Sequence, residues 1–259
     1  IFFLFIDVIK ISLYININLV ITHKIFLYNT KYMSQKLTIL FDLDGTLVDT
    51  APDLVLAHNY VMKKFGYPTK PASEIKALVG MGAGTMMGKT LWNSAKKELK
   101  KVKEKQIKKK MVNEFINFYG NNILIESKLI EGVKDFLIWC KENKISMGVC
   151  TNKQEYLAID LLKKIKINDY FEYVAGSDTF DYCKPDPRHL TSVIEIIGGD
   201  IKKTIMIGDS EVDAKSAENA SLPFVLLEDG YTNVKTSQMK YKHLIKNFIG
   251  LDSIIKNYI

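Results

Sequence analysis

Two aspartates spaced two residues apart are the clearest sign of chemistry in the sequence. The segment FDLDGTLVDT (residues 41–50) follows an apolar run and contains Asp42 and Asp44. Residues i and i+2 of a strand point to the same side, so both carboxylates are predicted to lie together at a strand end. Two such carboxylates repel each other unless a cation or a shared proton lies between them. We therefore expect a cation-dependent site here, because a turn cap would explain only one of them.

A second acidic motif, IGDSEVD (residues 207–213), places Asp209 and Asp213 after another apolar run. On its own this motif is a common helix N-cap pattern. In an open α/β sheet, however, ligands bind beyond the carboxyl ends of the strands, where the strand order reverses, and this brings Asp209 near Asp42 and Asp44. Hard oxygen donors without His or Cys suit octahedral Mg²⁺ and not zinc.

Two further segments carry polar groups suited to a phosphate. The run ISMGVCT (residues 145–151) ends at Thr151 and is followed by Asn152, which places a hydroxyl and an amide at the same edge of the sheet. In CKPDP, Lys184 is followed by two prolines that restrict the backbone around it. A single lysine usually lies on the surface, but beside a metal site it would face a phosphate as a point charge.

From Leu37 onward, short β-rich runs alternate with helical patterns, as in a parallel sheet covered on both faces. The expected strands are residues 37–42, 145–151, 173–176, 204–209 and 223–227. The expected helices lie near residues 132–143, 154–165, 187–197, 211–219 and 242–257. The roughly 80 residues after the first strand contain no convincing strand and predict helices near 53–65, 72–79, 84–97 and 98–119. The sequence thus predicts an α/β domain with a helical domain inserted after its first strand.

Residues 1–32 differ from the remainder, because they are rich in Ile, Phe, Asn and Tyr and carry few charges. Their longest uncharged run, residues 11–23, is shorter than the roughly 20 residues that a spanning helix needs. A signal peptide is not indicated, since a basic start and a small-residue cleavage site are missing. We interpret 1–32 as an extension without a folded role, and a membrane anchor or an added β-ribbon is the alternative. Residues 33–51 and 128–259 are assigned to the α/β core and 52–127 to the helical insert.

The composition is that of an ordinary globular protein. Of 259 residues, 47% are hydrophobic and 25% charged, which excludes wholesale disorder and collagen-like structure. This length corresponds to one or two domains. The three cysteines (Cys140, Cys150 and Cys183) form no CxxC pair. This argues against a disulfide framework and a zinc ribbon and predicts a reducing, cytoplasmic location.

The net charge of +7 comes from a single segment, residues 96–110, which holds nine Lys and two Glu. Apolar residues recur there at helical spacing, so we expect an amphipathic helix with a solvated lysine face. Arg188 is the only arginine, which argues against nucleic-acid recognition, because such recognition usually depends on arginine. Binding of an anion or a nucleic acid by this lysine face is the alternative from another functional class.

Taken together, DLDGT, a Thr ending the second strand, KPDP and GDSxxD resemble the four motifs of the haloacid dehalogenase-like hydrolase superfamily, from residue 37 to about 235. Within it, the chain is most similar to phosphoglycolate phosphatases, through DTAPDL (49–54), Asn59, VGMGAG (79–84) and CTNK. The resemblance implies a Rossmann-like sheet, an α-helical cap and Mg²⁺-dependent hydrolysis of a small phosphomonoester, with 2-phosphoglycolate as the first candidate. Phosphatases for nucleotides, pyrophosphate or sugar phosphates and a sugar-phosphate mutase are alternatives. Dehalogenases replace the second carboxylate, whereas Asp44 is intact here.

The resemblance also implies roles for the acidic residues. Asp42 would be the nucleophile that forms an aspartyl-phosphate, and Asp44 the general acid and base. The carboxylates of Asp42 and Asp209 and the backbone carbonyl of Asp44 would bind Mg²⁺. Asp213 would act through water or by contacting the other ligands.

Substrate contacts are expected from both domains. By the same resemblance, Thr151 and Lys184 would hold the phosphoryl oxygens, and Asn152 lies beside them. In the loop 79–84, Gly82 and Gly84 allow backbone N–H groups to approach a ligand, and a following helix N-terminus favours an anion. A plain interhelical turn is the alternative. We expect a small phosphorylated metabolite as the partner, neither nucleic acid nor membrane as the main one, and a monomer or homodimer.

Overall fold

The computed structural model describes residues 36–92 and 101–258, without the side chains of residues 90–92 and 101–105. The predicted extension 1–32 and the lysines at 96, 97 and 100 lie outside the described residues. Within the described part, no helix is both long and apolar enough to cross a membrane.

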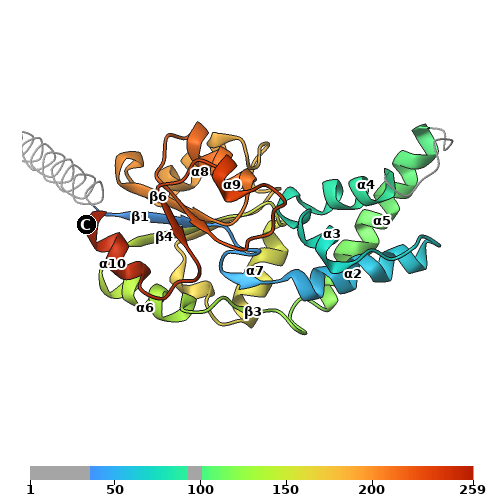
Figure 1. Ribbon diagram of the computed structural model, residues 1–259, viewed down its shortest axis with the longest axis horizontal. Coiled ribbons are helices and arrows are strands. Elements are labelled where there is room, and N and C mark those ends of the chain that lie inside the picture. The colour runs from blue at the N-terminus through green and yellow to red at the C-terminus, as the bar shows by residue number, and fades with distance from the viewer. Residues whose placement is uncertain (1–35, 93–100, 259) are drawn as a thin grey trace, which may run out of the picture.

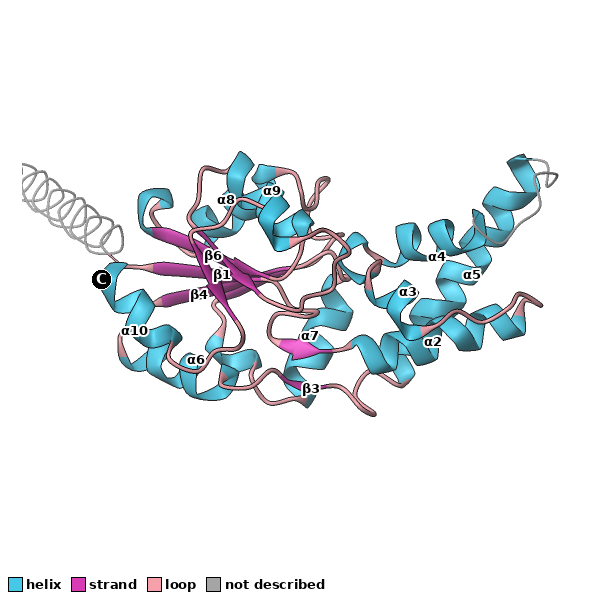
Figure 2. Cartoon of the chain, in the orientation of Figure 1, coloured by secondary structure: helices cyan, strands magenta, loops and turns pink. Residues whose placement is uncertain are grey.

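A six-stranded parallel sheet forms the centre of the larger domain (Figures 1 and 2), which confirms the predicted fold class. Its strand order is β5-β4-β1-β6-β7-β8. The strands are β1 Thr38–Phe41, β4 Ser146–Cys150, β5 Tyr173–Ala175, β6 Thr204–Gly208, β7 Phe224–Leu227 and β8 His243–Ile245. The chain runs outward from β1 through β4 to β5 and then from β6 through β7 to β8, so the strand order reverses between β1 and β6. This is where such sheets bind ligands.

Helices cover both faces of this sheet, as Figure 2 shows. They are α6 Val133–Glu142, α7 Glu155–Lys164, α8 Pro187–Ile196, α9 Glu211–Asn219 and α10 Leu251–Ile255. Side chains alternate along β1, so Ile39 and Phe41 belong to the core cluster that contains α6, α7 and α10, whereas Leu40 packs with α8 and α9. A strand buried on both faces is mostly apolar, which explains the run Ile39, Leu40 and Phe41 in β1.

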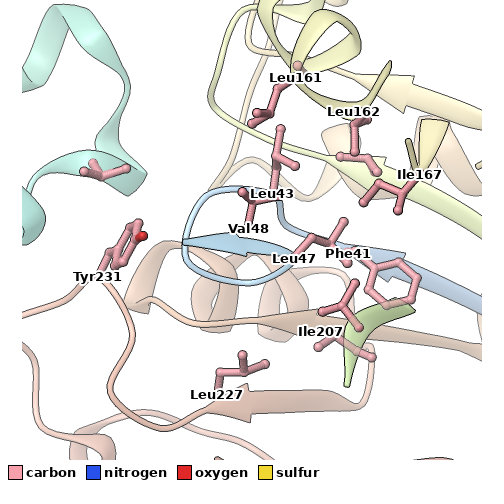
Figure 3. Close-up of a cluster of buried hydrophobic side chains, with 14 of the residues drawn as sticks. Phe41, Leu43, Leu47, Val48, Leu161, Leu162, Ile167, Ile207, Leu227 and Tyr231 are labelled. Carbon is pink, nitrogen blue, oxygen red and sulfur yellow. The ribbon is translucent and has the colours of Figure 1, made fainter. Parts of the chain in front are cut away.

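The first acidic motif is anchored in this core by its apolar residues. Leu43, Leu47 and Val48 are fully buried, and Figure 3 shows them among Leu161, Phe41 and their neighbours. Leu43 follows the strand end and points into the core, so the aspartates on either side of it are left at the edge of the sheet. The hydrophobic core therefore fixes the loop that presents the carboxylates.

The inserted segment forms a helical cap beyond the carboxyl ends of the strands (Figure 1), as predicted. Its elements are α2 Ala51–Lys64, α3 Ala72–Lys76, the 3₁₀ turn η1 Val79–Met81, α4 Ala83–Trp92 and α5 Lys101–Asn121. Helices α2 and α5 pack together, with the rings of Tyr60 and Phe118 stacked at a centroid distance of 3.9 Å. The boundaries predicted for the two domains, residues 52 and 127, stay a prediction.

The two chain segments that join cap and core are tied to each other. The short strands β2 Val48–Asp49 and β3 Lys128–Leu129 pair antiparallel, and neither was expected from the sequence. The buried carboxylate of Asp53 accepts hydrogen bonds from the backbone N–H groups of residues 125–127 and from the Ser127 hydroxyl. These contacts fasten the start of α2 to the segment that leaves the cap.

The C-terminal helix predicted over residues 242–257 is wrong in its first half. Residues 243–245 form β8, which pairs in parallel with β7, and α10 starts only at Leu251. Gly250 has a φ of 76°, a left-handed conformation that interrupts a continuous helix and favours glycine. Phe248 is buried between the two elements, so the apolar periodicity that suggested one helix comes from a strand, a turn and a short helix.

Candidate active site

The aspartates of the two acidic motifs meet at the reversal point of the sheet. Asp42 directly follows β1 and Asp209 directly follows β6, and these strands are hydrogen-bonded neighbours. The Asp42 N–H donates to the carbonyl of Ile207 at 2.9 Å, which continues the pairing up to the carboxylates. Oxygens of Asp42, Asp209 and Asp213 lie within 4.8 Å of one another, and all three residues are buried.

Lys184 lies inside this acidic cluster. Its Nζ donates to Asp42 Oδ1 at 2.8 Å and to Asp213 Oδ1 at 2.6 Å, and its side chain is only 2% exposed. Burial alone would lower the pKa of Lys184, but the carboxylates of Asp213 and Asp42 outweigh it and raise that pKa above its ordinary value. Lys184 is therefore a fixed positive charge beside Asp42.

One lysine does not balance three buried carboxylates. Burial raises the pKa of Asp42 to about 7, against the opposing effect of Lys184. Burial, followed by the charges of Asp213 and Asp42, raises the pKa of Asp209 well above its ordinary value. A divalent cation would relieve this repulsion, and carboxylate oxygens are the ligands that Mg²⁺ prefers. The donor set thus fits a hard divalent cation.

Asp209 is held in position through both of its oxygens. The Thr46 hydroxyl donates to Oδ1 at 2.8 Å, and the N–H of Tyr231 donates to Oδ2 at 2.7 Å. Gly45, with a φ of 88°, and Gly230 both lie so close to Asp209 that a side chain at either position would overlap it. The two glycines therefore allow the loops after β1 and β7 to close around this carboxylate.

Asp213 acts as part of a helix cap and as an ion-pair partner at once. Ser210 is the N-cap of α9, and its hydroxyl donates to Asp213 Oδ2 at 2.6 Å. The backbone N–H of Asp213 donates to the Ser210 hydroxyl oxygen, and the backbone N–H of Ser210 donates to Asp213 Oδ2 at 3.2 Å, which completes a capping box. The N-cap interpretation of this motif is confirmed, and Asp213 Oδ1 still faces Lys184.

Asp44 has a separate environment from Asp42. The Thr50 hydroxyl donates to Asp44 Oδ1 at 2.7 Å, and Lys153 Nζ lies 2.8 Å from each carboxylate oxygen. The Lys153 ammonium also lies 4.5 Å from the ring centroid of Tyr119, which belongs to cap helix α5. The two aspartates of the first motif are thus each paired with their own lysine, where the sequence predicted one shared cation.

Thr151 and Asn152 join the other motifs at the same edge of the sheet. Thr151 is buried, and its hydroxyl accepts a hydrogen bond from the N–H of Lys153 at 3.1 Å. The amide nitrogen of Asn152 donates to the carbonyls of Gly80 and Lys184, at 3.1 and 3.0 Å. Asn152 therefore ties the cap loop to the KPDP segment, and its N–H groups are used within the protein.

A cavity of about 430 Å³ opens between cap and core beside Asp44. Lys153 and Asn152 line it from the core, and Gly82 and Gly84 line it from the cap. The glycine loop does lie at the site, and α4 starts at Ala83, close to the expected helix N-terminus. Gly82 has a φ of 78°, and a side chain there would press against the Asn152 carbonyl.

A family profile for haloacid dehalogenase-like hydrolases matches residues 39–227. The chain belongs to this family. Phosphoglycolate phosphatases from Caulobacter vibrioides and Agrobacterium fabrum are each 36% identical to it over 212 residues, which cover 82% of this chain and 87% and 89% of theirs. The crystal structure of a predicted phosphoglycolate phosphatase from Haemophilus somnus is 28% identical, with a TM-score of 0.79, and the match covers 86% of this chain and 99% of that one.

Several residues that shape the site of this hydrolase were not anticipated. Lys153 is the last residue of CTNK, and its place directly after Thr151 and Asn152 was the available signal. Tyr119 lies in an apolar helix pattern that gives no sign of a functional contact. Tyr231 lies beyond GDSxxD, yet its N–H holds Asp209 and its hydroxyl donates to Asp49 at 2.5 Å, next to the cap connection.

The cysteines of this hydrolase take no part in the arrangement of charges. All three are free, and Cys140 and Cys150 are buried. Burial raises the pKa of Cys150 to about 12, so its thiol stays protonated and unreactive at neutral pH.

Proposed function

We propose that this hydrolase is a Mg²⁺-dependent phosphatase that cleaves a small phosphomonoester through an aspartyl-phosphate, with 2-phosphoglycolate as its substrate. The observation that carries the proposal is Lys184, buried between Asp42 and Asp213 and next to Asp209 at the reversal point of the sheet. This arrangement suits a dianionic phosphoryl group bound beside a divalent cation. The phosphoglycolate phosphatases among the relatives support the substrate.

The metal is proposed to be held by the carboxylates of Asp42 and Asp209 and by the backbone carbonyl of Asp44. Asp213 would assist through water or through its contact with Lys184. When bound, Mg²⁺ supplies positive charge that offsets the negative charge of the phosphoryl oxygens and of the nucleophile. The fit rests on the oxygen-only donor set and on the raised pKa values of Asp42 and Asp209.

Asp42 is the proposed nucleophile. Its carboxylate oxygen forms a bond to phosphorus while the bond from phosphorus to the alcohol oxygen breaks. Asp44 gives a proton to the departing alcohol and later takes one from the water that attacks the aspartyl-phosphate, which releases inorganic phosphate and regenerates Asp42. Lys153, which contacts both oxygens of Asp44, holds this carboxyl in position.

Thr151 and Lys184 are proposed to bind the phosphoryl oxygens. The Thr151 hydroxyl and the positive charge of Lys184 stabilise the negative charge that spreads over these oxygens. Asn152 contributes by joining the cap loop to the core, and its Oδ1 is buried without a hydrogen-bond partner among the described residues. Gly82 and Gly84 let the loop contact the polar end of the substrate. With the cap closed, bulk water is kept away from the aspartyl-phosphate until the alcohol leaves.

The nucleophile is tested by Asp42→Asn with p-nitrophenyl phosphate in the presence of Mg²⁺. We expect turnover to fall at least about 10³-fold, because the amide cannot form the covalent bond. Asp160→Asn is the matched control, since the Asp160 side chain is 41% exposed and pairs with Lys164 on the surface of α7. Near wild-type turnover by Asp42→Asn, or turnover that persists after chelation of divalent cations, would contradict the proposal.

The substrate is tested by comparing kcat/KM for 2-phosphoglycolate, nucleoside monophosphates, pyrophosphate and sugar phosphates. We expect the highest value for 2-phosphoglycolate. Release of inorganic phosphate, as opposed to isomerisation of a sugar phosphate, separates a phosphatase from a mutase.

A further inference from the structure

Tyr119 of cap helix α5 contacts the ion pair that holds the proposed acid–base group. The ammonium of Lys153 lies 4.5 Å from the centroid of the Tyr119 ring and 2.8 Å from each carboxylate oxygen of Asp44. The side chains of Lys153 and Asp44 are 5% and 8% exposed, and Tyr119 is 1% exposed. The buried ammonium therefore contacts both a carboxylate of the core and an aromatic ring of the cap.

The backbone of Lys153 is fixed by hydrogen bonds, whereas its side chain needs partners to hold it. The N–H of Lys153 donates to the Thr151 hydroxyl at 3.1 Å, and its carbonyl accepts from the N–H of Ser177 at 2.8 Å. A lysine side chain has many rotamers, and ordering it costs entropy. The negative face of an aromatic ring attracts an ammonium, and this attraction is strongest where water is excluded. The Tyr119 ring thus favours the rotamer that directs Lys153 at Asp44.

The end of helix α5 lies against the core at this point. A Cβ at Gly120 would lie 3.2 Å from Cδ2 of Leu157, so the glycine that follows Tyr119 allows α5 to come close to α7. Within the cap, Phe115 stacks parallel to Tyr119 with a centroid distance of 6.0 Å. The Tyr119 hydroxyl is buried and has no hydrogen-bond partner among the described residues. The contacts described for Tyr119 are thus those of its ring.

Building on the proposed phosphatase function, we propose that the ring of Tyr119 is a positioning group for the general acid, because it holds Lys153 against the carboxyl of Asp44 that protonates the leaving alcohol. Without the ring, Asp44 keeps the Thr50 hydroxyl, but water reaches the Lys153 ammonium and weakens its pairing with the carboxylate. Misplacement of an acid by about 1 Å is enough to slow proton transfer. Acid catalysis in the core thus depends on a residue that the cap supplies.

The test uses two aryl esters of similar shape that differ in their need for a proton. p-Nitrophenolate leaves readily as an anion, whereas phenolate leaves more slowly without a proton from the acid. We expect Tyr119→Met to lower kcat/KM for phenyl phosphate by about 10-fold, a part of the roughly 10²- to 10⁴-fold that a general acid contributes. The value for p-nitrophenyl phosphate should fall by less than about threefold, because its departure needs little help from Asp44. A purely structural role of Tyr119 would lower both values alike.

Phe115→Met is the matched control, because it removes a ring from the same helix and the same cavity wall. It should leave the ratio of the two kcat/KM values as in the wild type. Tyr119→Phe keeps the ring and should retain most of the turnover of phenyl phosphate. Trifluorophenylalanine in place of Tyr119 keeps the shape of phenylalanine but has a less negative face, so its loss should lie between those of Tyr119→Phe and Tyr119→Met. An unchanged ratio in Tyr119→Met, or a loss in Tyr119→Phe as large as in Tyr119→Met, would overturn the role of the ring.

Acetylation of lysines with acetic anhydride, followed by peptide mass spectrometry, provides a readout that needs no turnover. Lys153 should react more slowly than the exposed Lys164 in the wild type. Its reaction should be faster in Tyr119→Met but not in Phe115→Met, and an equal rate in all three proteins would show that the ring does not hold Lys153. If the wild type hydrolyses neither ester while the reactivity of Lys153 depends on the ring, the phosphatase proposal fails and the positioning of Lys153 by Tyr119 stands.

Discussion

The two sides of the site are built in different ways. On the phosphoryl side, Asp42, Lys184 and Asp213 are buried and joined at 2.6 to 2.8 Å. They come from the end of β1, a loop and the first turn of α9 in the core. On the alcohol side, the cavity of about 430 Å³ is walled partly by cap helices, and among its described lining residues Asp44 is the one carboxylate. The proposed chemistry thus resides where buried ion pairs of the core fix the side chains, and the proposed selectivity resides in the wall that the cap supplies.

Among the variants that compare the two sides, Lys184→Met is expected to have the largest effect, because it removes the cation of the phosphoryl side. Breaking a buried ion pair from one side typically costs about 3–5 kcal/mol of the free energy of unfolding. Urea denaturation in the presence of EDTA measures this loss. Turnover of p-nitrophenyl phosphate should also fall at least about 10²-fold, because Lys184 is proposed to stabilise the transition state.

The control for this variant is Lys215→Met, since Lys215 is exposed and pairs with Glu218 on α9. Mg²⁺ should restore part of the stability of Lys184→Met, because it offsets the same carboxylates, but not its turnover. Wild-type stability without divalent cation would show that the buried pairs are not what holds the phosphoryl side together.

Lys153→Met is expected to have the next largest effect, since it acts where the two sides meet. Asp44 would keep the Thr50 hydroxyl but lose both contacts to Lys153. We expect kcat/KM to fall about 10- to 100-fold for 2-phosphoglycolate and 2-hydroxyethyl phosphate alike, because misplacing an acid–base group slows every ester. Lys164→Met, on the exposed end of α7, is the matched control. A loss confined to 2-phosphoglycolate would instead make Lys153 a carboxylate-binding residue.

The same contrast explains what could be predicted from the sequence. Asp42 and Asp209 follow buried apolar strands, and the topology of a parallel sheet brings such strand ends together, so their proximity was predictable. For Lys153 the available signal was its place directly after Thr151 and Asn152, whereas Lys108 could not be identified in this way. Lysines are abundant in this chain, and only the packing of the cap shows which of them face the cavity.

The errors in the fold have a similar origin. Strands β2 and β3 have only two residues each, too few for any periodicity to show. Strand β8 is three residues long at the edge of the sheet, and its pairing with β7 determines its conformation more than its own sequence does. Long patterns such as that of α9, predicted over residues 211–219, were confirmed because helical spacing is repeated within them.

A smaller effect, on the alcohol side alone, is expected from filling the cavity. Gly84 lines the cavity, and a Cβ at this position would meet no atom within 4 Å. Gly84→Leu should therefore fold normally and lower kcat/KM for 2-phosphoglycolate about 10-fold, while methyl phosphate, whose leaving group is methanol, changes little. Gly66→Leu is not a suitable control, because Gly66 has a φ of 78°. Gly82 also has a positive φ, so Gly82→Leu is strained and should lower kcat/KM for both substrates. A loss on both substrates indicates a distorted loop, whereas a loss on 2-phosphoglycolate alone indicates a blocked cavity.

The smallest effect concerns the buried imidazole of His189, which is uncharged in the folded protein at neutral pH. His189 in α8 is fully buried, and burial, followed by the charge of Lys184, lowers its pKa to about 4. Because the unfolded chain binds a proton near pH 6.5 and the folded chain does not, stability is fully present above pH 6.5 and is lost as the pH falls toward 4. For this single group the free energy of unfolding should fall by about 1 kcal/mol between pH 8 and pH 6. Urea denaturation across this range should show a shallower pH dependence for His189→Gln than for the wild type. Identical slopes would mean that His189 is protonated in the folded protein and that, like the charges of the phosphoryl side, it has a partner.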